Sequence, residues 1–226
     1  MNLIKYKRVN SELDLILKYI TPKNKTIIDA GCGSGYLTLK LANAGGKVYG
    51  IDTPAIVKKL INLKHKNTFF KPGKSENLPF ENEFADAIIY YSSFHHVAKD
   101  KMTKAIEECN RVLKPGGLAV FVEPSLEKGC YFELLRIVLD ERKIQKYAYK
   151  IIKTIPNYGF NPVTEKHIYL IRTLNDFSDL VNKFIKNKKD KKTAILKAEK
   201  KTTNSEKNNH LFRSTARVNI YKKIHK

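Results

Sequence analysis

Hydrophobic positions in the first part of this chain follow two alternating spacings. Over residues 11–20, apolar residues recur every three or four positions after a capping serine and stop before Pro22, which predicts a surface helix. Residues 26–29 form a short apolar run that leads into a glycine cluster, and helical spacing resumes over residues 36–44. This order predicts a strand, a tight loop and a helix.

The same alternation continues to about residue 125. Further strands are expected at residues 47–52, 67–70, 85–91 and 118–122, with one helix after the first of these and another between the last two. The run 85–91 is apolar on both faces, which is typical of a buried parallel strand. Alternating strands and helices predict a doubly wound α/β sheet with right-handed crossovers.

The remainder of the chain has a different pattern. Helical spacing is expected from about Tyr131 to Ile152, and two period-2 runs follow at residues 167–171 and 216–221. Between these runs lies a lysine-rich segment with few apolar residues. There we expect one or two surface helices and then a loosely structured stretch near residues 202–209.

Length and composition indicate a packed protein. Of the 226 residues, 42% are hydrophobic and 29% charged, which excludes a wholly disordered or fibrous chain. We expect a single domain over residues 1–226, with a core at 25–125 and a lid and C-terminal elaboration at 126–226. The charged first twenty residues and the absence of a long apolar run predict no signal peptide and no membrane insertion. Three cysteines at unrelated spacings fit a reducing cytoplasm, not a disulfide framework or a zinc site.

The charge is unevenly distributed along the chain. Residues 1–140 hold 21 basic and 15 acidic side chains, whereas residues 141–226 hold 22 and 7. Such an excess fits a surface for nucleic acid, anionic lipid or an acidic substrate. Lysine outnumbers arginine 36 to 7, however, and phosphate recognition usually recruits arginine as well. Compositional drift is therefore the simpler interpretation.

The glycine cluster after the first buried strand is the main chemical signal. Gly31, Gly33 and Gly35 follow Asp29, each separated from the next by one residue. Glycines allow positive φ and let a ligand approach the backbone closely. A dinucleotide fingerprint would need glycine where Tyr36 stands, and a P-loop would need a Gly-Lys-Ser/Thr ending, which is absent. The loop therefore fits a different cofactor.

The glycine loop is one of five sequence blocks that occur here in the order found in a known family. The other four are Val48–Asp52, Glu76–Phe80, Ser92–Val97 and Arg111–Gly117. Over about residues 25–125 they resemble the class I S-adenosylmethionine-dependent methyltransferases, and most of all the ubiquinone/menaquinone-biosynthesis-type (methyltransferase domain 11-like) branch. The resemblance implies a seven-stranded Rossmann-like sheet whose last strand, near residues 216–221, is antiparallel and lies beside the fifth. One departure, Ala85 inserted between Phe84 and Asp86, predicts a local change of register.

The resemblance also implies S-adenosylmethionine as cofactor. Asp52 would accept hydrogen bonds from both ribose hydroxyls, and Asp29 would order the glycine loop and face the methionine end, although either could act only as a cap. Lys74 stands where relatives commonly hold adenine with an acidic residue, so the Ser75 amide or Glu76 would replace that contact. We assign cofactor binding to Asp29, Gly31, Gly33, Gly35, Asp52, Ser75, Glu76 and Ser92.

The loop after the fourth strand of such a sheet points at the transferred methyl group. His95 and His96 titrate near neutrality, so either could act as a general base, with His95 slightly favoured, or both could be structural. The sulfonium is already a good leaving group, so the reaction requires no metal and we assign no metal ligands. The aromatic residues after the fifth strand could form core or an acceptor lid; they are Tyr131, Phe132, Tyr147, Tyr149, Tyr158 and Phe160.

These features predict a methyltransferase for a small-molecule or lipid-like acceptor. The histidine loop lacks the Asn/Asp-Pro-Pro-Tyr/Phe motif of enzymes that methylate exocyclic amines of DNA bases and protein glutamine. An RNA (tRNA) methyltransferase is the alternative, suggested by the basic C-terminal third and the paired histidines. A third hypothesis is a cofactor-binding partner subunit without transfer activity. Neither the acceptor nor the oligomeric state can be derived from the sequence.

Overall fold

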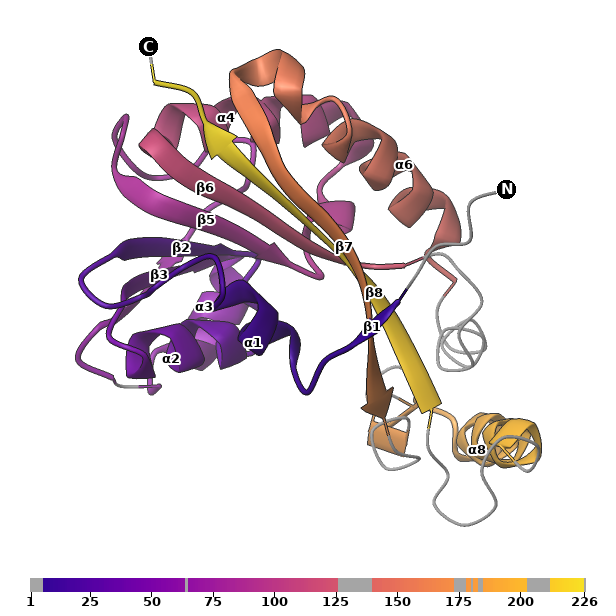
Figure 1. The fold of residues 1–226 in the computed structure, drawn as a ribbon. Coiled ribbons are helices and arrows are strands. Elements are labelled where there is room, and N and C mark those ends of the chain that lie inside the picture. Colours follow the sequence, from indigo (N-terminus) through magenta and orange to yellow (C-terminus); the bar gives the residue numbers. More distant parts are fainter. Residues whose placement is uncertain are drawn as a thin grey trace, which may run out of the picture.

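The fold is built around one sheet with eight strands among the described residues (Figure 1). The computed structural model describes residues 6–63, 65–125, 140–172, 178–179, 181–182, 185–202 and 212–225. The strand order is β1-β7-β8-β6-β5-β2-β3-β4. The strands are β1 (Lys7–Arg8), β2 (Thr26–Ala30), β3 (Lys47–Asp52), β4 (Thr68–Pro72), β5 (Ala85–Tyr91), β6 (Leu113–Pro124), β7 (Phe160–Arg172) and β8 (Phe212–Lys223).

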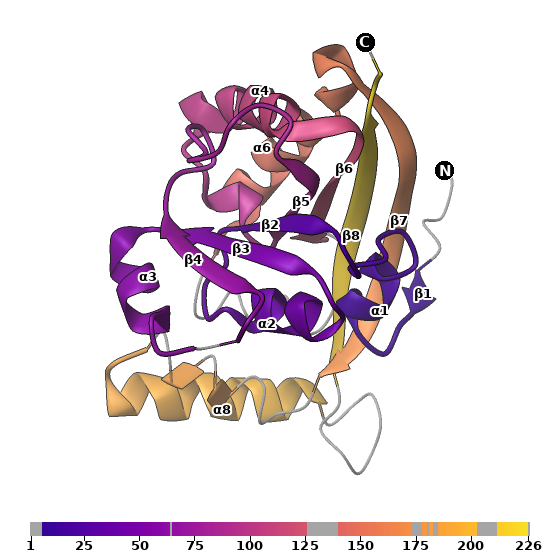
Figure 2. The same cartoon turned by 90° about the vertical axis from the view of Figure 1, so that its left-hand side faces the viewer.

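Helices cover both faces of this sheet. Helices α4 and α6 lie on one face, and α1, α2 and α3 lie on the other (Figure 2). Short 3-10 turns occur at Phe94–His96, Lys99–Lys101 and Ile155–Tyr158. The helices are α1 (Glu12–Ile16), α2 (Tyr36–Asn43), α3 (Pro54–Leu60), α4 (Met102–Val112), α6 (Arg142–Ile152) and α8 (Lys188–Thr202).

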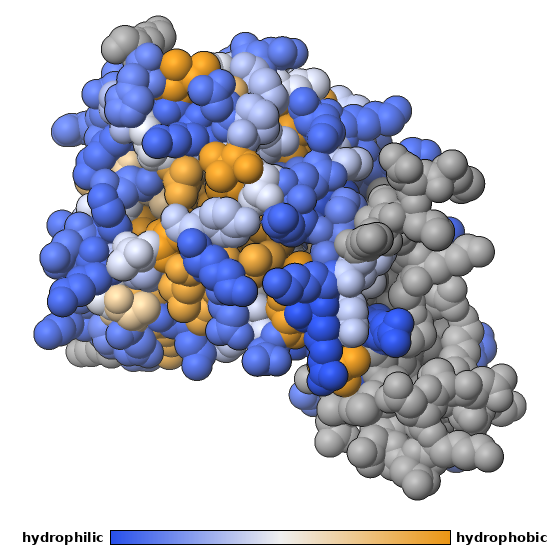
Figure 3. All heavy atoms as spheres, viewed as in Figure 1, coloured by the Kyte–Doolittle hydropathy of each residue, from blue (hydrophilic) through white to orange (hydrophobic). Residues whose placement is uncertain are grey.

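Two hydrophobic cores follow from the alternation of side chains along the strands. Ile28 and Ile88 face the core shared with α4 and α6, whereas Ile27 and Ile89 face the core shared with α1 and α2. Burial of consecutive strand residues on both faces confirms the doubly wound α/β prediction. On the face shown in Figure 3, apolar side chains gather between α1 and the strands and are surrounded by hydrophilic residues.

The antiparallel strand lies where the family resemblance implied. Strand β8 is antiparallel to both of its neighbours, β6 and β7, and β6 contains the strand expected at residues 118–122. Within the described part of the chain the sheet has eight strands, not seven, because β1 pairs with β7 in parallel through Lys7 and Arg8. A two-residue strand carries no hydrophobic periodicity, so the sequence could not reveal it.

The register change expected near the inserted alanine is confirmed. The pairing of β5 with β6 shifts between Ala85 and Ala87, and the carboxylate of Asp86 accepts a hydrogen bond from the Thr26 amide at 2.8 Å. The irregularity therefore turns Asp86 toward the start of β2. This hydrogen bond joins the amino end of β5 to the amino end of the neighbouring strand β2.

The C-terminal part is described only partly. Helix α6 confirms the helical prediction over residues 142–152, and α8 confirms a helix in the lysine-rich segment. Figure 1 shows α8 away from the centre of the sheet, beside the far ends of β7 and β8. The predictions for residues 131–139 and 203–209 lie outside the described residues. Among the described helices, none combines the length and apolar character needed to cross a membrane.

Candidate cofactor and transfer site

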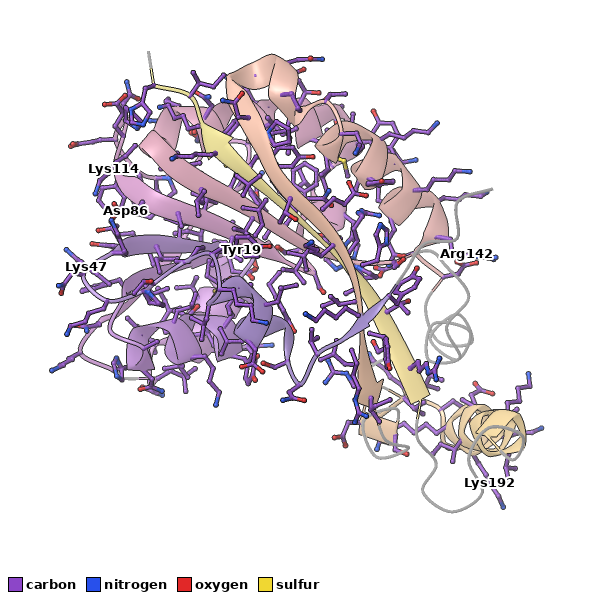
Figure 4. The ribbon with its side chains drawn as sticks, viewed as in Figure 1. Tyr19, Lys47, Asp86, Lys114, Arg142 and Lys192 are labelled. Atoms are coloured by element: carbon purple, nitrogen blue, oxygen red, sulfur yellow. The ribbon has the colours of Figure 1, made fainter. Side chains whose placement is uncertain are left out.

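The predicted site residues lie at one edge of the sheet. Strands β2, β3, β5 and β6 are parallel, so their carboxyl ends meet there. In Figure 4, Lys47, Asp86 and Lys114 mark the opposite edge, where the strands begin. Arg142, at the start of α6, lies on the side of the carboxyl ends.

The glycine loop needs its glycines for conformation and for space. Gly31, Gly33 and Gly35 have φ of 77°, 54° and 76°, in the left-handed region that other residues rarely adopt. A Cβ on Gly31 would lie 2.6 Å from Cβ of Ser93, whereas no atom of the described protein lies within 4 Å of a Cβ built on Gly33. The loop is therefore packed against the protein at Gly31 and open at Gly33.

Asp52, at the end of β3, is tied directly to this loop. Its Oδ2 accepts a hydrogen bond from the Gly33 amide at 2.9 Å, and its Oδ1 accepts one from the Thr53 amide at 2.7 Å. Each carboxylate oxygen has a second lone pair, so both can accept further hydrogen bonds. This geometry is compatible with a ligand that offers two adjacent hydroxyls.

Asp29 is buried beneath the glycine loop with 1% of its surface exposed. The Thr38 hydroxyl, in the first turn of α2, donates to its Oδ2 at 2.7 Å. Burial raises the pKa of Asp29 to about 6, against the effect of the hydrogen bonds from Thr38. The contact joins the end of β2 to the helix after the loop, which fits the expected role in ordering the loop.

The turn after β4 brings Ser75 and Glu76 to the same edge. The Gly73 amide donates to the Asp52 carbonyl at 3.0 Å, and the Asn77 amide donates to the Lys74 carbonyl at 3.0 Å. These two bonds hold the turn next to the end of β3. Ser75 and Glu76 are half-buried, and the turn that contains them follows Asp52 around the edge of the sheet.

The histidine loop begins with a strained residue. Ser92 has φ of 49°, which is uncommon for a residue with a side chain, and its amide donates to the Val122 carbonyl at 2.7 Å. The Ser93 hydroxyl then donates to the Ala30 carbonyl at 2.6 Å. The histidine loop is therefore fastened to the residue that precedes Gly31.

One buried carboxylate organises the rest of this loop. Glu123, near the end of β6 and 2% exposed, accepts hydrogen bonds at Oε1 from the amides of Ser93 and Phe94, at 3.2 and 2.9 Å. Its Oε2 forms a short hydrogen bond with Nδ1 of His95. Three donors on consecutive residues thus converge on a single side chain, which fixes both the loop and the orientation of the His95 ring.

A second carboxylate, Glu141, approaches both histidines from the start of α6. One of its oxygens lies 3.4 Å from Nε2 of His95, and the other lies 3.6 Å from Nδ1 of His96. His95 is buried, whereas the side chain of His96 is 59% exposed. The two rings lie 4.1 Å apart between centroids.

The two histidines differ in their tendency to carry a proton. Burial favours neutral His95, but the hydrogen bond and charge of Glu123, together with the charge of Glu141, raise its pKa. Burial, and then the neighbouring charge of His95, lower the pKa of His96. Because both ring nitrogens of His95 face carboxylates, His96 is the better placed of the two to accept a proton from a ligand.

The structure joins residues that sequence reasoning had left apart. It brings the glycine loop, Asp52 and the histidine loop together, but Glu123 and Glu141 were not among the predicted site residues. Glu123 could have been found from its position at the end of a parallel strand, where ligands usually bind. Glu141 carries no such signal, because it lies outside residues 25–125 and a long segment of sequence separates it from the end of β6.

Several of the aromatic candidates for a lid have structural roles. Phe160 is buried in the core shared with α4 and α6, and Tyr158 packs against it. The Tyr149 hydroxyl donates to Glu165 at 2.8 Å, and the guanidinium of Arg217 lies 3.4 Å from the centre of its ring. Tyr147 is 37% exposed. Tyr131 and Phe132 lie outside the described residues.

Comparisons with known proteins find methyltransferases. Residues 28–121 match the family described as methyltransferase domain. An uncharacterized methyltransferase of Oceanobacillus iheyensis is 28% identical over 182 residues, which cover 76% of this chain and 83% of the relative. A demethylmenaquinone methyltransferase of Chlorobaculum tepidum is 27% identical over 60% of this chain and 56% of its own. A tRNA (carboxymethyluridine(34)-5-O)-methyltransferase of Arabidopsis thaliana is 37% identical over 44% of this chain and 24% of its own.

Solved structures share the fold over nearly the whole chain. A SAM-dependent methyltransferase from Methanosarcina mazei has a TM-score of 0.60 and 18% sequence identity, and the match covers 99% of this chain and 100% of the other. At this identity the likeness shows the fold alone. The matched domain shows that residues 28–121 form a methyltransferase domain, and the methyltransferase relatives and the shared Rossmann-like fold make this chain similar to the S-adenosylmethionine-dependent methyltransferases.

Proposed function

We propose that this protein transfers the methyl group of S-adenosylmethionine to a small-molecule or lipid-like acceptor. The observation that carries the proposal is the continuous set of contacts from Asp52 through Gly33 to Ala30 and Ser93. It links the position expected for the ribose to the position expected for the methyl group. A sulfonium donor needs mainly alignment of the acceptor, and this fastened loop supplies a fixed frame for it.

Most of the predicted cofactor residues have a direct role in this proposal. The ribose hydroxyls bind Asp52, and adenine lies against the turn that holds Ser75 and Glu76. The methionine end passes over the open side of the loop at Gly33, near Asp29 and Ser92. The space beside Gly33 is large enough to admit a ligand there, since a Cβ built on Gly33 meets no described atom of a non-neighbouring residue within 4 Å.

The acceptor is placed beside the paired histidines. His96 takes its proton in this proposal, because its side chain is exposed and its lowered pKa keeps the imidazole neutral. His95 holds the loop through Glu123 and is a positioning residue. This assignment revises the sequence expectation, which slightly favoured His95 as the base.

The C-terminal part belongs to the same domain in this proposal. Strands β7 and β8 pair with each other and, through β6, with the rest of the sheet, so the cofactor half and the C-terminal half share hydrogen bonds. We therefore propose one methyltransferase domain over residues 1–226, with residues 126–226 contributing the lid and elaboration.

RNA remains the second candidate acceptor. It is favoured by the basic residues after position 140 and by the likeness to a tRNA methyltransferase. The small-molecule class is preferred because the match to the demethylmenaquinone methyltransferase is longer and α8 contains lysine but no arginine.

The proposal is tested by following the methyl group itself. The purified chain is incubated with methyl-labelled S-adenosylmethionine and, in parallel, with a small-molecule extract, a lipid extract and total RNA. Label is expected in the small-molecule or lipid fraction, where mass spectrometry identifies the product. Label confined to RNA would overturn the acceptor class, and no labelled product together with firm cofactor binding would favour the non-catalytic hypothesis.

A further inference from the structure

We infer that His95, His96 and Glu141 form a binding site for one divalent transition metal ion of the zinc type. One potential ligand atom from each of these three residues lies within 4.8 Å of the ligand atoms of the other two. Two of these residues belong to the histidine loop, and the third precedes α6. Two imidazoles and one carboxylate are a donor set that zinc accepts in proteins.

The distances from the two histidine nitrogens to the oxygens of Glu141 are compatible with ligands around a small cation. Hydrogen-bonded pairs of an imidazolium and a carboxylate lie about 2.7–2.9 Å apart. Here the two histidine nitrogens lie 3.4 and 3.6 Å from the oxygens of Glu141. Tetrahedral zinc with bonds of about 2.0–2.2 Å keeps neighbouring donor atoms about 3.3–3.6 Å apart. Both nitrogen–oxygen distances are therefore longer than those of a hydrogen-bonded ion pair and leave room for a bridging metal ion.

Glu123 supports this cluster by bonding the ring nitrogen of His95 that does not face Glu141. Metal-binding histidines usually donate the proton of their second nitrogen to a carboxylate or carbonyl, which fixes the tautomer and the ring. Nδ1 of His95 donates to Glu123, so the lone pair of Nε2 is directed toward Glu141 and His96. Glu123 is itself held by the amides of Ser93 and Phe94. The first ligand is thus oriented before any metal binds.

Glu141 is unusual for the position that it occupies. It is the N-cap residue of α6, yet its side chain makes no capping hydrogen bond to the helix. Serine, threonine, aspartate and asparagine are the residues that normally cap helices in this way. The Glu141 carboxylate, 22% exposed, instead faces the two histidines. Its placement is explained by the cluster and not by the helix.

The donor types select the metal. Magnesium and calcium prefer sites made of oxygen atoms, whereas imidazole nitrogen suits zinc, cobalt, nickel and iron(II). Both described cysteines lie outside the cluster, and burial raises the pKa of the Cys32 thiol, which keeps it protonated. Three protein ligands leave a fourth position of the tetrahedron for an exchangeable ligand, as in catalytic zinc sites.

The role of this open position rests on the proposed function. An acceptor hydroxyl, enol or thiol that binds the metal loses its proton to solvent more readily, because the cation stabilises the anion. The resulting oxygen or sulfur lone pair forms a bond to the methyl carbon while the carbon–sulfur bond of the sulfonium breaks and releases S-adenosylhomocysteine. The site therefore favours acceptors with an acidic hydroxyl or a thiol over amines.

Direct metal binding to the full chain tests the site. After treatment with a chelator, the protein is titrated with Zn²⁺ by calorimetry and with Co²⁺ by visible absorption, whose ligand-field bands report the ligands. We expect one ion per chain. Glu141→Gln and His96→Gln should each weaken binding at least tenfold, and Glu123→Gln about 10–100-fold. His225→Gln, an exposed histidine after β8, is the matched control and should bind as the wild type does.

Two results would overturn the inference. One is the absence of stoichiometric binding by the wild type, and the other is equal binding by the wild type and Glu141→Gln. Circular dichroism and S-adenosylhomocysteine binding check that each variant is folded. Because cofactor binding is measured separately, failure of the metal site and failure of the proposed methyl transfer give different results.

Discussion

The two ends of the same parallel strands hold their carboxylates in different ways. At the amino ends, Asp86 accepts a hydrogen bond from the Thr26 amide and pairs with the ammonium groups of Lys25 and Lys114 at 3.5 and 3.1 Å. At the carboxyl ends, the buried carboxylates of Asp29 and Glu123 meet a hydroxyl, backbone amides and an imidazole.

This difference separates a structural edge from a ligand-binding edge. Partial burial works against ionisation of Asp86, but the Thr26 amide and then Lys114 lower its pKa, so its charge is neutralised within the protein. Among the described residues, no lysine or arginine lies within ion-pair distance of Asp29, Asp52 or Glu123. The carboxylate of Asp52 therefore remains available to a ligand at the edge where the cofactor is expected.

The largest expected effect comes from Gly33→Val. Cofactor binding should be lost, because the new side chain fills the open space above the loop. The fold should survive, since a left-handed conformation costs roughly 1–2 kcal/mol in a residue with a Cβ. Calorimetry with S-adenosylhomocysteine and urea unfolding measure the two effects.

Gly45→Val is the matched control for this variant. Gly45 also has a positive φ, 94°, but its carbonyl accepts from the Asn24 amide at the amino edge. It should lose stability to a similar extent and keep its affinity for the cofactor. Normal binding by Gly33→Val would show that the glycine loop does not hold the cofactor.

Asp52→Ala should have the next largest effect. Hydrogen bonds to a charged group contribute roughly 1.5–3 kcal/mol, so affinity for S-adenosylmethionine and S-adenosylhomocysteine should fall about 10–150-fold. Asp86→Ala, at the opposite edge, should leave both affinities unchanged and lower the free energy of unfolding by roughly 1–3 kcal/mol. Equal affinities in wild type and Asp52→Ala would remove Asp52 from the cofactor site.

The sequence predicted the part of the molecule within residues 25–125, where regular hydrophobic periodicity and the glycine motif occur together. Strand β5 and helix α4 have uninterrupted apolar periodicity. The spacing of the glycines in the glycine loop is typical of few classes of cofactor. Strand β1 and Glu141 were missed for a common reason. Each depends on a partner far away in the chain, Ile168 for Lys7 and the histidines for Glu141, and short segments carry no local signal of such contacts.

A smaller effect is expected from pH through Asp29. Its pKa is raised to about 6, so the folded state retains a proton that the unfolded chain loses near pH 4. Stability should therefore fall as the pH rises through 6. Between pH 5 and 7.5, the wild type should lose about 1 kcal/mol relative to Asp29→Asn, as measured by urea unfolding without cofactor. Parallel pH profiles for the two proteins would show that Asp29 ionises normally.

The smallest effect is expected from the lysines of the C-terminal helix region. Lys186, Lys189 and Lys192 are exposed, and Lys192 projects from α8 in Figure 4. Replacing all three by glutamine should leave methyl transfer to the small-molecule acceptor unchanged. Fluorescence anisotropy across a salt series would reveal RNA binding. Tight binding that survives physiological salt, is lost in the triple variant and accompanies RNA methylation would reverse the choice of acceptor.

The most direct test of the central claim is a calorimetric titration of the wild-type chain with S-adenosylmethionine and S-adenosylhomocysteine. The carboxylate-rich edge should bind one molecule of either ligand with micromolar affinity, about −7 to −8 kcal/mol. Gly45→Val and Asp86→Ala should show the same affinity. Absence of binding by the folded wild type would contradict the assignment of this edge as a cofactor site and, with it, the proposed methyl transfer.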